Sequence, residues 1–286
     1  ITKKAVIHGI ENPRQIEPLL VDAYMARRAL DYLVGFNISP ILWTKLPGSK
    51  SAGRVQSVAL KLITEREHEI ELFDPEEFWT LSVQFNDNDK NSILASITQL
   101  NDKKIEKFSF KNKAEIDKAI NEVKSKKFNI KDISSKVVNR NPSGPFTTST
   151  LQQVSSGRLG FGASRTMQIA QKLYQGIEID GETIGLITYM RTDGTNLSTD
   201  AIDTFRKYIK NEFGENYVPD IAASYSGKKA KNAQEAHEAI RPTDIMRAPD
   251  TVKKYLSPDQ HKLYDLIWSR ALSSQMKPAQ FDRNTI

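Results

Sequence analysis

The stretch that most restricts how this chain can fold is Gly185 to Ser198, which reads GLITYMRTDGTNLS. Leu186 to Met190 are β-branched, aromatic or apolar and predict a strand. The stretch then turns polar and breaks at a glycine. Side chains alternate between the two faces of a strand, so Tyr189, Arg191 and Asp193 are expected to face the same way. This pattern predicts a phenol, a guanidinium and a carboxylate together at a strand end, or, as the simpler alternative, a strand tyrosine beside a surface ion pair.

The charge and composition of the whole chain permit several functions and exclude a few. The 286 residues contain 41 Lys and Arg against 35 Asp and Glu, a net charge of +6, which allows nucleic-acid binding without requiring it. There are no cysteines, so disulfides and thiolate zinc sites are excluded within these residues. No apolar run is long enough for a membrane span, so no membrane association is expected. The chain starts without a Met and ends on residues typical of a strand, which indicates a piece of a longer protein.

Shifts in residue pattern predict three domains within these residues. Residues 1–74 have helical periodicity, whereas residues 75–144 contain alternating strand patterns around one helix and are expected to be β-rich. Residues 145–274 are expected to be mainly helical. The chain is then expected to return to the β-rich domain at about residues 275–286.

The helix expected from Pro18 to about Phe36 carries an arginine and two aromatic residues in a row. Its buried stripe is expected to consist of Leu19, Ala23, Ala26, Leu30, Leu33 and Val34. Arg28, Tyr32 and Phe36 follow one another at i, i+4 and i+8 along the edge of the other face. A cation followed by two rings could stack the bases of a single strand. The alternative is an arginine that packs its stem over two half-buried rings.

A glycine-containing loop, GSKSAG at residues 48–53, leads into a second helix from Arg54 to about Leu72. The buried face of this helix is expected to include Val55, Val58, Ala59 and Leu62. Free backbone N–H groups at its start, with Arg54 beside them, could hold a backbone phosphate, or the segment is an ordinary helix start. The spacing of a nucleotide P-loop is absent.

Three further helix features concern the C-terminal half. Ser164 and Ser198 are expected to be the N-caps of helices that begin just after them. Gln234 to Arg241 (QEAHEAIR) is expected to be a short helix ended by Pro242. A lone histidine such as His237 on such a helix is ordinarily structural.

Three groups of segments together resemble the bacterial type IA DNA topoisomerases. They are SAGRVQSVALKLITERE at 51–67, PFTTSTLQQVSS and RLGFGASRTMQIAQKLY within 145–174, and GLITYMRTDGTNLS with AHEAIRPT at 236–243. The resemblance implies a multidomain α+β protein of toroidal arrangement, with a helical single-strand-groove domain, a β-rich arch or hinge, and a mainly helical domain that carries a nucleophilic tyrosine.

The resemblance also implies roles for particular residues. Tyr189 would attack a DNA phosphodiester to give a 5′-phosphotyrosine and a free 3′-hydroxyl, Arg191 would bind the reacting phosphate, and His237 would assist by hydrogen bonding. The implied DNA-binding residues are Arg27, Arg28, Asp31, Tyr32, Phe36, Arg54, Gln56 and Asp193. For Asp193 two roles stay open: it holds Arg191, or it forms the turn. Tyr32 and Phe36 differ from the arginine and tyrosine of enterobacterial relatives, which puts the base preference in question.

The chemistry suits these residue types. A phenol is a weak nucleophile at neutral pH, and a neighbouring guanidinium stabilises the charge that builds on the reacting phosphate. The covalent link conserves the energy of the broken bond, so no ATP is needed. In the family Mg²⁺ is held by an acidic Asp-x-Asp-x-Glu cluster, which these residues lack; no metal site is therefore expected here, and the chain alone is expected not to relax supercoiled DNA.

The resemblance implies a monomeric, cytoplasmic, nucleoid-associated bacterial enzyme that acts on single-stranded segments of negatively supercoiled DNA. A passive single-strand DNA clamp, whose tyrosine only stacks on bases, is the alternative. A tyrosine recombinase is a third interpretation, but that class spaces its histidine and arginine as H-x-x-R, whereas His237 and Arg241 are spaced as H-x-x-x-R.

Overall fold

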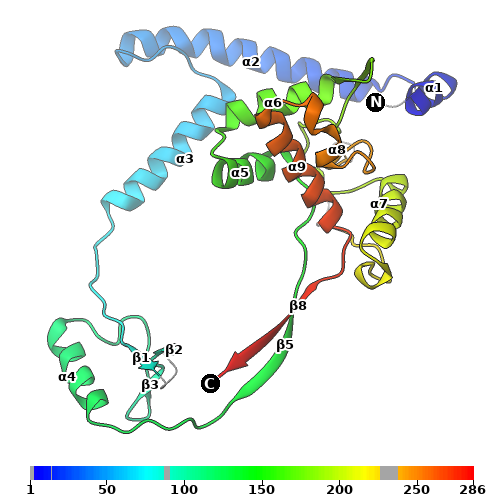
Figure 1. Cartoon of the computed structure of the whole chain (residues 1–286). Helices are drawn as coiled ribbons and strands as arrows, with labels where there is room; N and C mark the ends of the chain where they lie inside the picture. The colour runs from blue at the N-terminus through cyan, green and yellow to red at the C-terminus, as the bar shows by residue number, and fades with distance from the viewer. Residues whose placement is uncertain (1–2, 14, 87–90, 226–237) are drawn as a thin grey trace. The chain divides into compact units, whose positions relative to one another are not determined.

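A computed structural model describes residues 3–13, 15–86, 91–225 and 238–286 of the chain. Backbone contacts divide it into two compact units, residues 2–129 and residues 130–286, which are described separately here (Figure 1). Each unit combines helices with short antiparallel strands. This mixture confirms the expected α+β class, while the toroidal arrangement and the three-domain division stay predictions.

Three helices open the first unit: α1 (Lys3–Glu11), α2 (Pro18–Lys45) and α3 (Arg54–Glu71). α2 begins at the proline, as predicted, because a residue without an N–H suits the first turn. It continues past Phe36 and through Pro40, so it is longer than the sequence pattern indicated.

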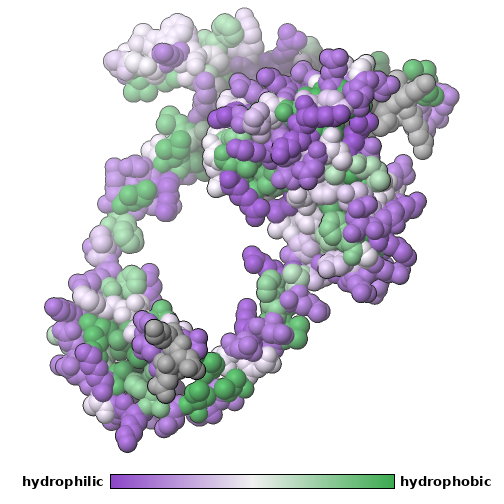
Figure 2. Space-filling model, in the orientation of Figure 1, coloured by the Kyte–Doolittle hydropathy of each residue, from purple (hydrophilic) through white to green (hydrophobic). Residues whose placement is uncertain are grey.

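The expected burial of the apolar faces of α2 and α3 is wrong for the described part of this chain. Leu19 is 83% exposed, and the only buried residue in the two helices is Ser39. Val55, Val58 and Leu62 of α3 are exposed as well, and hydrophobic surface is visible along α3 in Figure 2. Periodicity identifies a face that favours burial, but it does not say that a covering element is present.

The rest of the first unit is a small α/β module. β1 (Ser82–Asn86) pairs with β2 (Ser92–Ser96), and β3 (Gln99–Leu100) pairs with β4 (Lys103–Lys104), both antiparallel. α4 (Lys113–Lys124) is capped by the Asn112 side chain, which accepts from the Glu115 N–H. The core of the module is Phe110, Ile116 and Ala119, with Trp79 and Leu81 packed against it.

The second unit is built on a helical core. Its helices are α5 (Thr148–Leu159), α6 (Ala163–Gln175), α7 (Thr199–Glu212), α8 (Pro249–Val252) and α9 (Pro258–Ser273), with 3₁₀ turns η1 (Glu215–Tyr217) and η2 (Lys253–Tyr255). α5, α6 and α9 bury side chains against one another, among them Leu151, Leu173 and Leu263. A hairpin of β6 (Ile177–Ile179) and β7 (Glu182–Ile184) follows α6.

The two expected N-caps have different outcomes. Ser198 caps α7, accepting from the Ala201 N–H, as predicted. Ser164 is not a cap, because α6 begins one residue earlier at Ala163 and Gly162 occupies the cap position without a side-chain bond.

A two-stranded ribbon extends from this helical core. β5 (Ser134–Arg140) pairs antiparallel with β8 (Ala279–Thr285), with Ser134 opposite Thr285 and Arg140 opposite Ala279 (Figure 1). The chain therefore enters the helical core from this ribbon before α5 and returns to the ribbon after α9. No helix in the described ranges is both long and apolar enough to cross a bilayer.

Candidate active site and nucleic-acid interface

The predicted strand at Leu186–Met190 is not a ladder strand. β7 ends at Ile184, and in the following segment only Ile187 forms an isolated antiparallel bridge, to Pro242. The predicted alternation nevertheless holds: Tyr189, Arg191 and Asp193 are exposed, whereas Met190 and Thr192 between them are buried. An extended backbone is enough to alternate side chains, with or without a neighbouring strand in register.

Tyr189 presents its ring edge to a neighbouring helix. The ring is 46% exposed and meets the Tyr174 ring of α6 edge-on, at 5.2 Å between centroids. Such a contact fixes the ring while the hydroxyl group stays uncovered. The Tyr189 hydroxyl has no hydrogen-bond partner among the described residues, so it is available to a ligand.

Arg191 and Asp193 are exposed and make no ion pair or hydrogen bond with any described residue. The suggested role of Asp193 in holding Arg191 therefore has no contact to support it. The turn instead relies on Thr192, whose hydroxyl accepts from the Gly194 N–H at 3.0 Å. The guanidinium of Arg191 has all of its donors free for an anion, within the part of the chain described.

Thr148, at the start of α5, holds the backbone behind these side chains. Its hydroxyl donates to the Met190 carbonyl at 2.7 Å and lies 2.8 Å from the Thr192 N–H, which donates to it. The Thr148 N–H donates to the Thr192 carbonyl at 2.8 Å. Thr148 was not identified from the sequence. The signal that could have identified it is the run of threonines at the start of α5, where only one threonine, Thr147, is needed as the N-cap.

Residues 238–243 support the same stretch from the other side. The Thr188 hydroxyl donates to the Ala239 carbonyl at 2.7 Å, and the Thr188 N–H donates to the Arg241 carbonyl at 2.9 Å. Further along, the Thr243 hydroxyl donates to the Gly185 carbonyl at 2.7 Å. These bonds join two segments that lie far apart in the sequence.

The predicted helix at Gln234–Arg241 is wrong in its described part. Glu238 and Ile240 form isolated bridges to Asn196 and Phe146, so residues 238–241 are extended. Pairing with two distant segments, one of them at the buried Phe146, outweighs the local helix propensity of the AHEAIR string. His237 lies outside the described residues.

Glu238 and Arg241 form a half-buried ion pair that sequence reasoning did not identify. Arg241 Nε donates to Glu238 Oε1 at 2.6 Å, and Nη2 donates to Oε2 at 3.0 Å. Glu238 Oε1 also accepts from the Ser198 N–H at 2.9 Å, which connects the pair to the start of α7. Burial raises the pKa of Glu238, but the bonds and charge of Arg241 and the bonds from Ser198 outweigh it and leave that pKa below its ordinary value.

The predicted groove residues of the first unit are joined by one ion pair. Arg54 Nη2 lies 2.8 Å from Asp31 Oδ1 and donates to the Arg27 carbonyl at 3.4 Å, which links α3 to α2. The intervening loop is fixed on α2 as well: Trp43 Nε1 donates to the Lys50 carbonyl at 2.6 Å, and the Ala52 N–H donates to the Ser39 hydroxyl at 3.2 Å.

The aromatic row on α2 is open to solvent. Tyr32 and Phe36 are 62% and 68% exposed, and their centroids lie 4.5 Å apart. Arg28, one turn earlier, is exposed and has no partner in the described ranges. The alternative of an arginine packed over half-buried rings therefore does not fit.

Gln56 accepts from the Ser51 hydroxyl at 3.4 Å at the start of α3, where Gly53 provides no side-chain cap.

The described residues offer no site that fits a catalytic Mg²⁺ ion. They contain no group of three or more His, Cys, Asp or Glu side chains placed to hold a metal. No step of the chemistry can therefore be assigned to a metal on these residues.

Comparisons with known proteins agree with one another. The model of the DNA topoisomerase family matches residues 15–286. "DNA topoisomerase 1" of Rickettsia felis is 54% identical over 282 residues, covering 99% of this chain and 36% of that protein. The protein of the same name from Zymomonas mobilis is 50% identical over 286 residues, covering 100% of this chain and 22% of its own length. This chain thus spans about a third or less of these two relatives.

A solved structure extends the likeness to three dimensions. Full-length topoisomerase I from Thermotoga maritima superposes with a TM-score of 0.80 and 39% sequence identity, covering 99% of this chain and 44% of that one. The family match, the identities of 50% and 54% to the two relatives and the shared fold confirm the resemblance inferred from the sequence: this chain belongs to the bacterial type IA DNA topoisomerase family.

Proposed function

We propose that this chain supplies the strand-cleaving tyrosine and a single-strand-binding surface of an enzyme that relaxes negatively supercoiled DNA without ATP. The observation that carries the proposal is that Tyr189 and Arg191 are exposed on one face of their segment, and that the hydroxyl and the guanidinium have no partner among the described residues. Both lie on a backbone fixed by Thr148 and by residues 238–243.

In the proposed cleavage step the Tyr189 oxygen attacks a backbone phosphorus. The phenol gives up its proton to solvent, a Tyr–O–P bond forms with the phosphate at the newly created 5′ end, the P–O3′ bond breaks, and the departing 3′ oxygen takes up a proton. Arg191 holds the phosphate oxygens, because its fork matches phosphate geometry and stays charged. Attack by the 3′-hydroxyl reverses the step and reseals the strand.

The groove residues are proposed to bind the single strand. Tyr32 and Phe36 present two uncovered rings on which bases can stack, with Arg28 one turn away for the backbone. Arg54, held by Asp31, stands at the uncapped start of α3, where free N–H groups favour a phosphate. Arg27, Gln56 and Asp193 complete the proposed DNA-binding set, and His237 is proposed to assist Tyr189.

Other parts of the proposal concern the whole protein. We propose that Mg²⁺ binds to acidic residues outside this chain, that the enzyme is a monomer, and that it works in the bacterial cytoplasm at the nucleoid. The passive DNA clamp is the competing function, since the exposed rings on α2 would serve it equally well.

Covalent trapping distinguishes the two functions. The full-length protein with Mg²⁺ is incubated with a labelled single-stranded oligonucleotide, denatured, and examined for a protein–DNA adduct. Tyr189→Phe should abolish the adduct, because it removes the attacking oxygen and keeps the ring. Tyr174→Phe is the matched control and should form the adduct, since this neighbouring hydroxyl has no assigned part in cleavage. A persistent adduct in Tyr189→Phe, or none in the unaltered protein, would exclude the proposal.

A further inference from the structure

Tyr225 lies where the ribbon joins the helical core, and its side chain reaches both chain crossings. Its hydroxyl is within donating distance of the Ser274 carbonyl, at 3.0 Å, and of the Pro142 carbonyl, at 3.2 Å. Pro142 follows β5, and Ser274 precedes β8. One phenol therefore bridges the segment that leads from β5 into the core and the segment that leads from the core to β8.

The ring of Tyr225 is fixed by close contact with the segment between β5 and α5. A methyl group in place of the Gly144 hydrogen would lie 2.8 Å from the Tyr225 ring, so the ring packs directly on the glycine. The Gly144 carbonyl accepts from Arg270 Nε of α9 at 2.8 Å. Burial raises the pKa of Tyr225, opposed by the charge of Arg270, so the hydroxyl keeps the proton that it donates.

The backbone of Tyr225 is joined to the candidate active site. The Thr195 hydroxyl donates to the Tyr225 carbonyl at 2.8 Å. Thr195 follows the turn that ends the Tyr189 segment. A single residue thus has its carbonyl at the cleavage-site turn and its hydroxyl at the two crossings of the ribbon.

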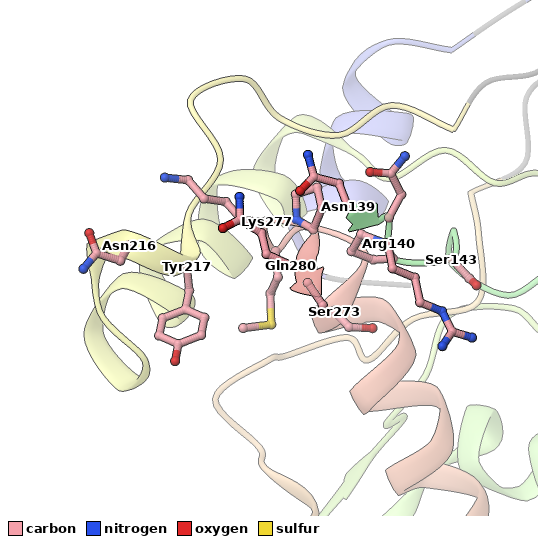
Figure 3. Close-up of a pocket in the computed structure, with 13 residues that line it drawn as sticks. Asn139, Arg140, Ser143, Asn216, Tyr217, Ser273, Lys277 and Gln280 are labelled. Carbon is pink, nitrogen blue, oxygen red and sulfur yellow. The ribbon is translucent and has the colours of Figure 1, made fainter. Parts of the chain in front are cut away.

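Further contacts hold these crossings: Ser274 and Gln275 are buried, and Gln275 Nε2 donates to the Ala223 carbonyl at 3.1 Å. A recess of about 860 Å³ opens beside them, lined by residues of the end of β5, of η1 and of the segment between α9 and β8. Figure 3 shows mostly polar side chains around it, among them Asn139, Tyr217 and Lys277, and none of the lining residues is acidic. On its recess side the root of the ribbon is polar and held by discrete hydrogen bonds, among them those of Tyr225, and such bonds can open locally.

We propose that Tyr225 is a positioning residue that holds the two crossings of the ribbon together and connects them to the cleavage-site turn. Through these contacts its hydroxyl stabilises the arrangement in which the two ends of the cleaved DNA strand lie close enough to be resealed. This inference rests on the proposed function, because passing a strand through a break requires the protein to separate the two ends. Removal of the hydroxyl should favour the opened state without affecting the attack by Tyr189.

The test compares two DNA substrates in the full-length protein with Mg²⁺. In Tyr225→Phe, the fraction of protein covalently bound to negatively supercoiled circular DNA should rise by up to about fivefold. This is the change in equilibrium constant that corresponds to the loss of one typical hydrogen bond. The amount of adduct with a short oligonucleotide should be unchanged, because no second DNA strand has to pass through the break. Hydrogen exchange should become faster in residues 274–280 at the ribbon root.

Tyr264→Phe is the matched control, because it also loses a tyrosine bond to a backbone carbonyl, that of Arg247 at 2.7 Å, away from the crossings. Gly144→Ala is the second variant and should act like Tyr225→Phe, since it displaces the ring and keeps the hydroxyl. Equal behaviour of Tyr225→Phe and Tyr264→Phe would overturn the inference, as would a loss of oligonucleotide cleavage in Tyr225→Phe. Absence of any adduct in the unaltered protein would instead exclude the proposed function.

Discussion

Short hydroxyl side chains fix the position of Tyr189. Thr148 and Thr188 each use one hydroxyl to bond a backbone group of another segment, at 2.7 Å in both cases. A threonine hydroxyl both donates and accepts hydrogen bonds. It can therefore satisfy the backbone N–H and C=O groups of an extended segment that has no neighbouring strand to bond with. This leaves the longer polar side chains of the segment free to face a ligand.

Glu238 should stabilise the fold in a pH-dependent way. Glu238→Gln removes the charge that Arg241 contacts through two bonds, and we expect a loss of about 2 kcal/mol in unfolding free energy at pH 7. The folded-state pKa of Glu238 lies below its ordinary value, so the carboxylate stabilises the fold above that value and loses this effect as pH falls through the folded-state pKa.

Denaturant unfolding of both proteins from pH 7 down to pH 3 measures this effect. The difference between them should shrink below about pH 4.3, the ordinary glutamate pKa. Glu215→Gln is the control, because its pair with Lys210 is exposed and should matter little. A difference that stays constant over the whole pH range would contradict the assigned ion pair.

At the scale of elements, the close approach of α6 to the Tyr189 segment depends on a glycine. A Cβ at Gly185 would lie 2.6 Å from the Tyr174 carbonyl oxygen, a contact that the backbone must move to relieve. The adjacent Leu186 N–H donates to the Leu173 carbonyl at 2.8 Å. The end of α6 thus determines where the Tyr189 segment starts, and Tyr174 in the same turn contacts the Tyr189 ring.

Gly185→Ala should therefore impair both stability and cleavage. We expect a loss of about 1–3 kcal/mol, as for other overpacked sites, together with slower formation of the oligonucleotide adduct at a temperature where the variant is folded. Calorimetry and single-turnover trapping measure the two effects. Gly157→Ala in α5 is the control: a Cβ there meets nothing within 4 Å, and it should stabilise the helix by about 0.5–1 kcal/mol. Unchanged adduct formation in Gly185→Ala would show that the spacing from α6 is not important.

At the scale of the whole molecule, the candidate residues are divided between the two compact units. The predicted DNA-binding residues of α2 and α3 belong to residues 2–129, and Tyr189 and Arg191 belong to residues 130–286. The groove unit buries little of α2 and α3, whereas the second unit has an extensive core. The net charge of the whole chain, +6, is compatible with binding to the negatively charged DNA backbone.

We expect the 286-residue chain alone to bind single-stranded oligonucleotides weakly and with strong salt dependence, and not to relax supercoiled DNA. The reason is that the arginines of the groove are present while no described residues form a metal-holding cluster. Fluorescence anisotropy at several salt concentrations and a relaxation assay with Mg²⁺ test this. Arg28→Ala should weaken binding, whereas Arg66→Ala, which removes a residue paired with Glu69, should change it less. Efficient relaxation by this chain alone would contradict the expectation.

The sequence by itself determined the chemistry-bearing residues and much of the local structure. Alternation put Tyr189, Arg191 and Asp193 on one face, and cap and proline signals located the starts of α2 and α7. These features depend on neighbours in the chain, so a local pattern is sufficient to predict them. Motif resemblance added the family, which periodicity alone could not provide.

Only the tertiary structure decided what each segment contacts. It replaced the expected ladder strand with a segment held by threonine hydroxyls, made residues 238–241 extended, and left the apolar stripes of α2 and α3 uncovered within the described chain. It also placed Tyr225 between the turn and the ribbon. Such contacts join residues far apart in the sequence, and their energies outweigh local propensities of a fraction of a kcal/mol per residue.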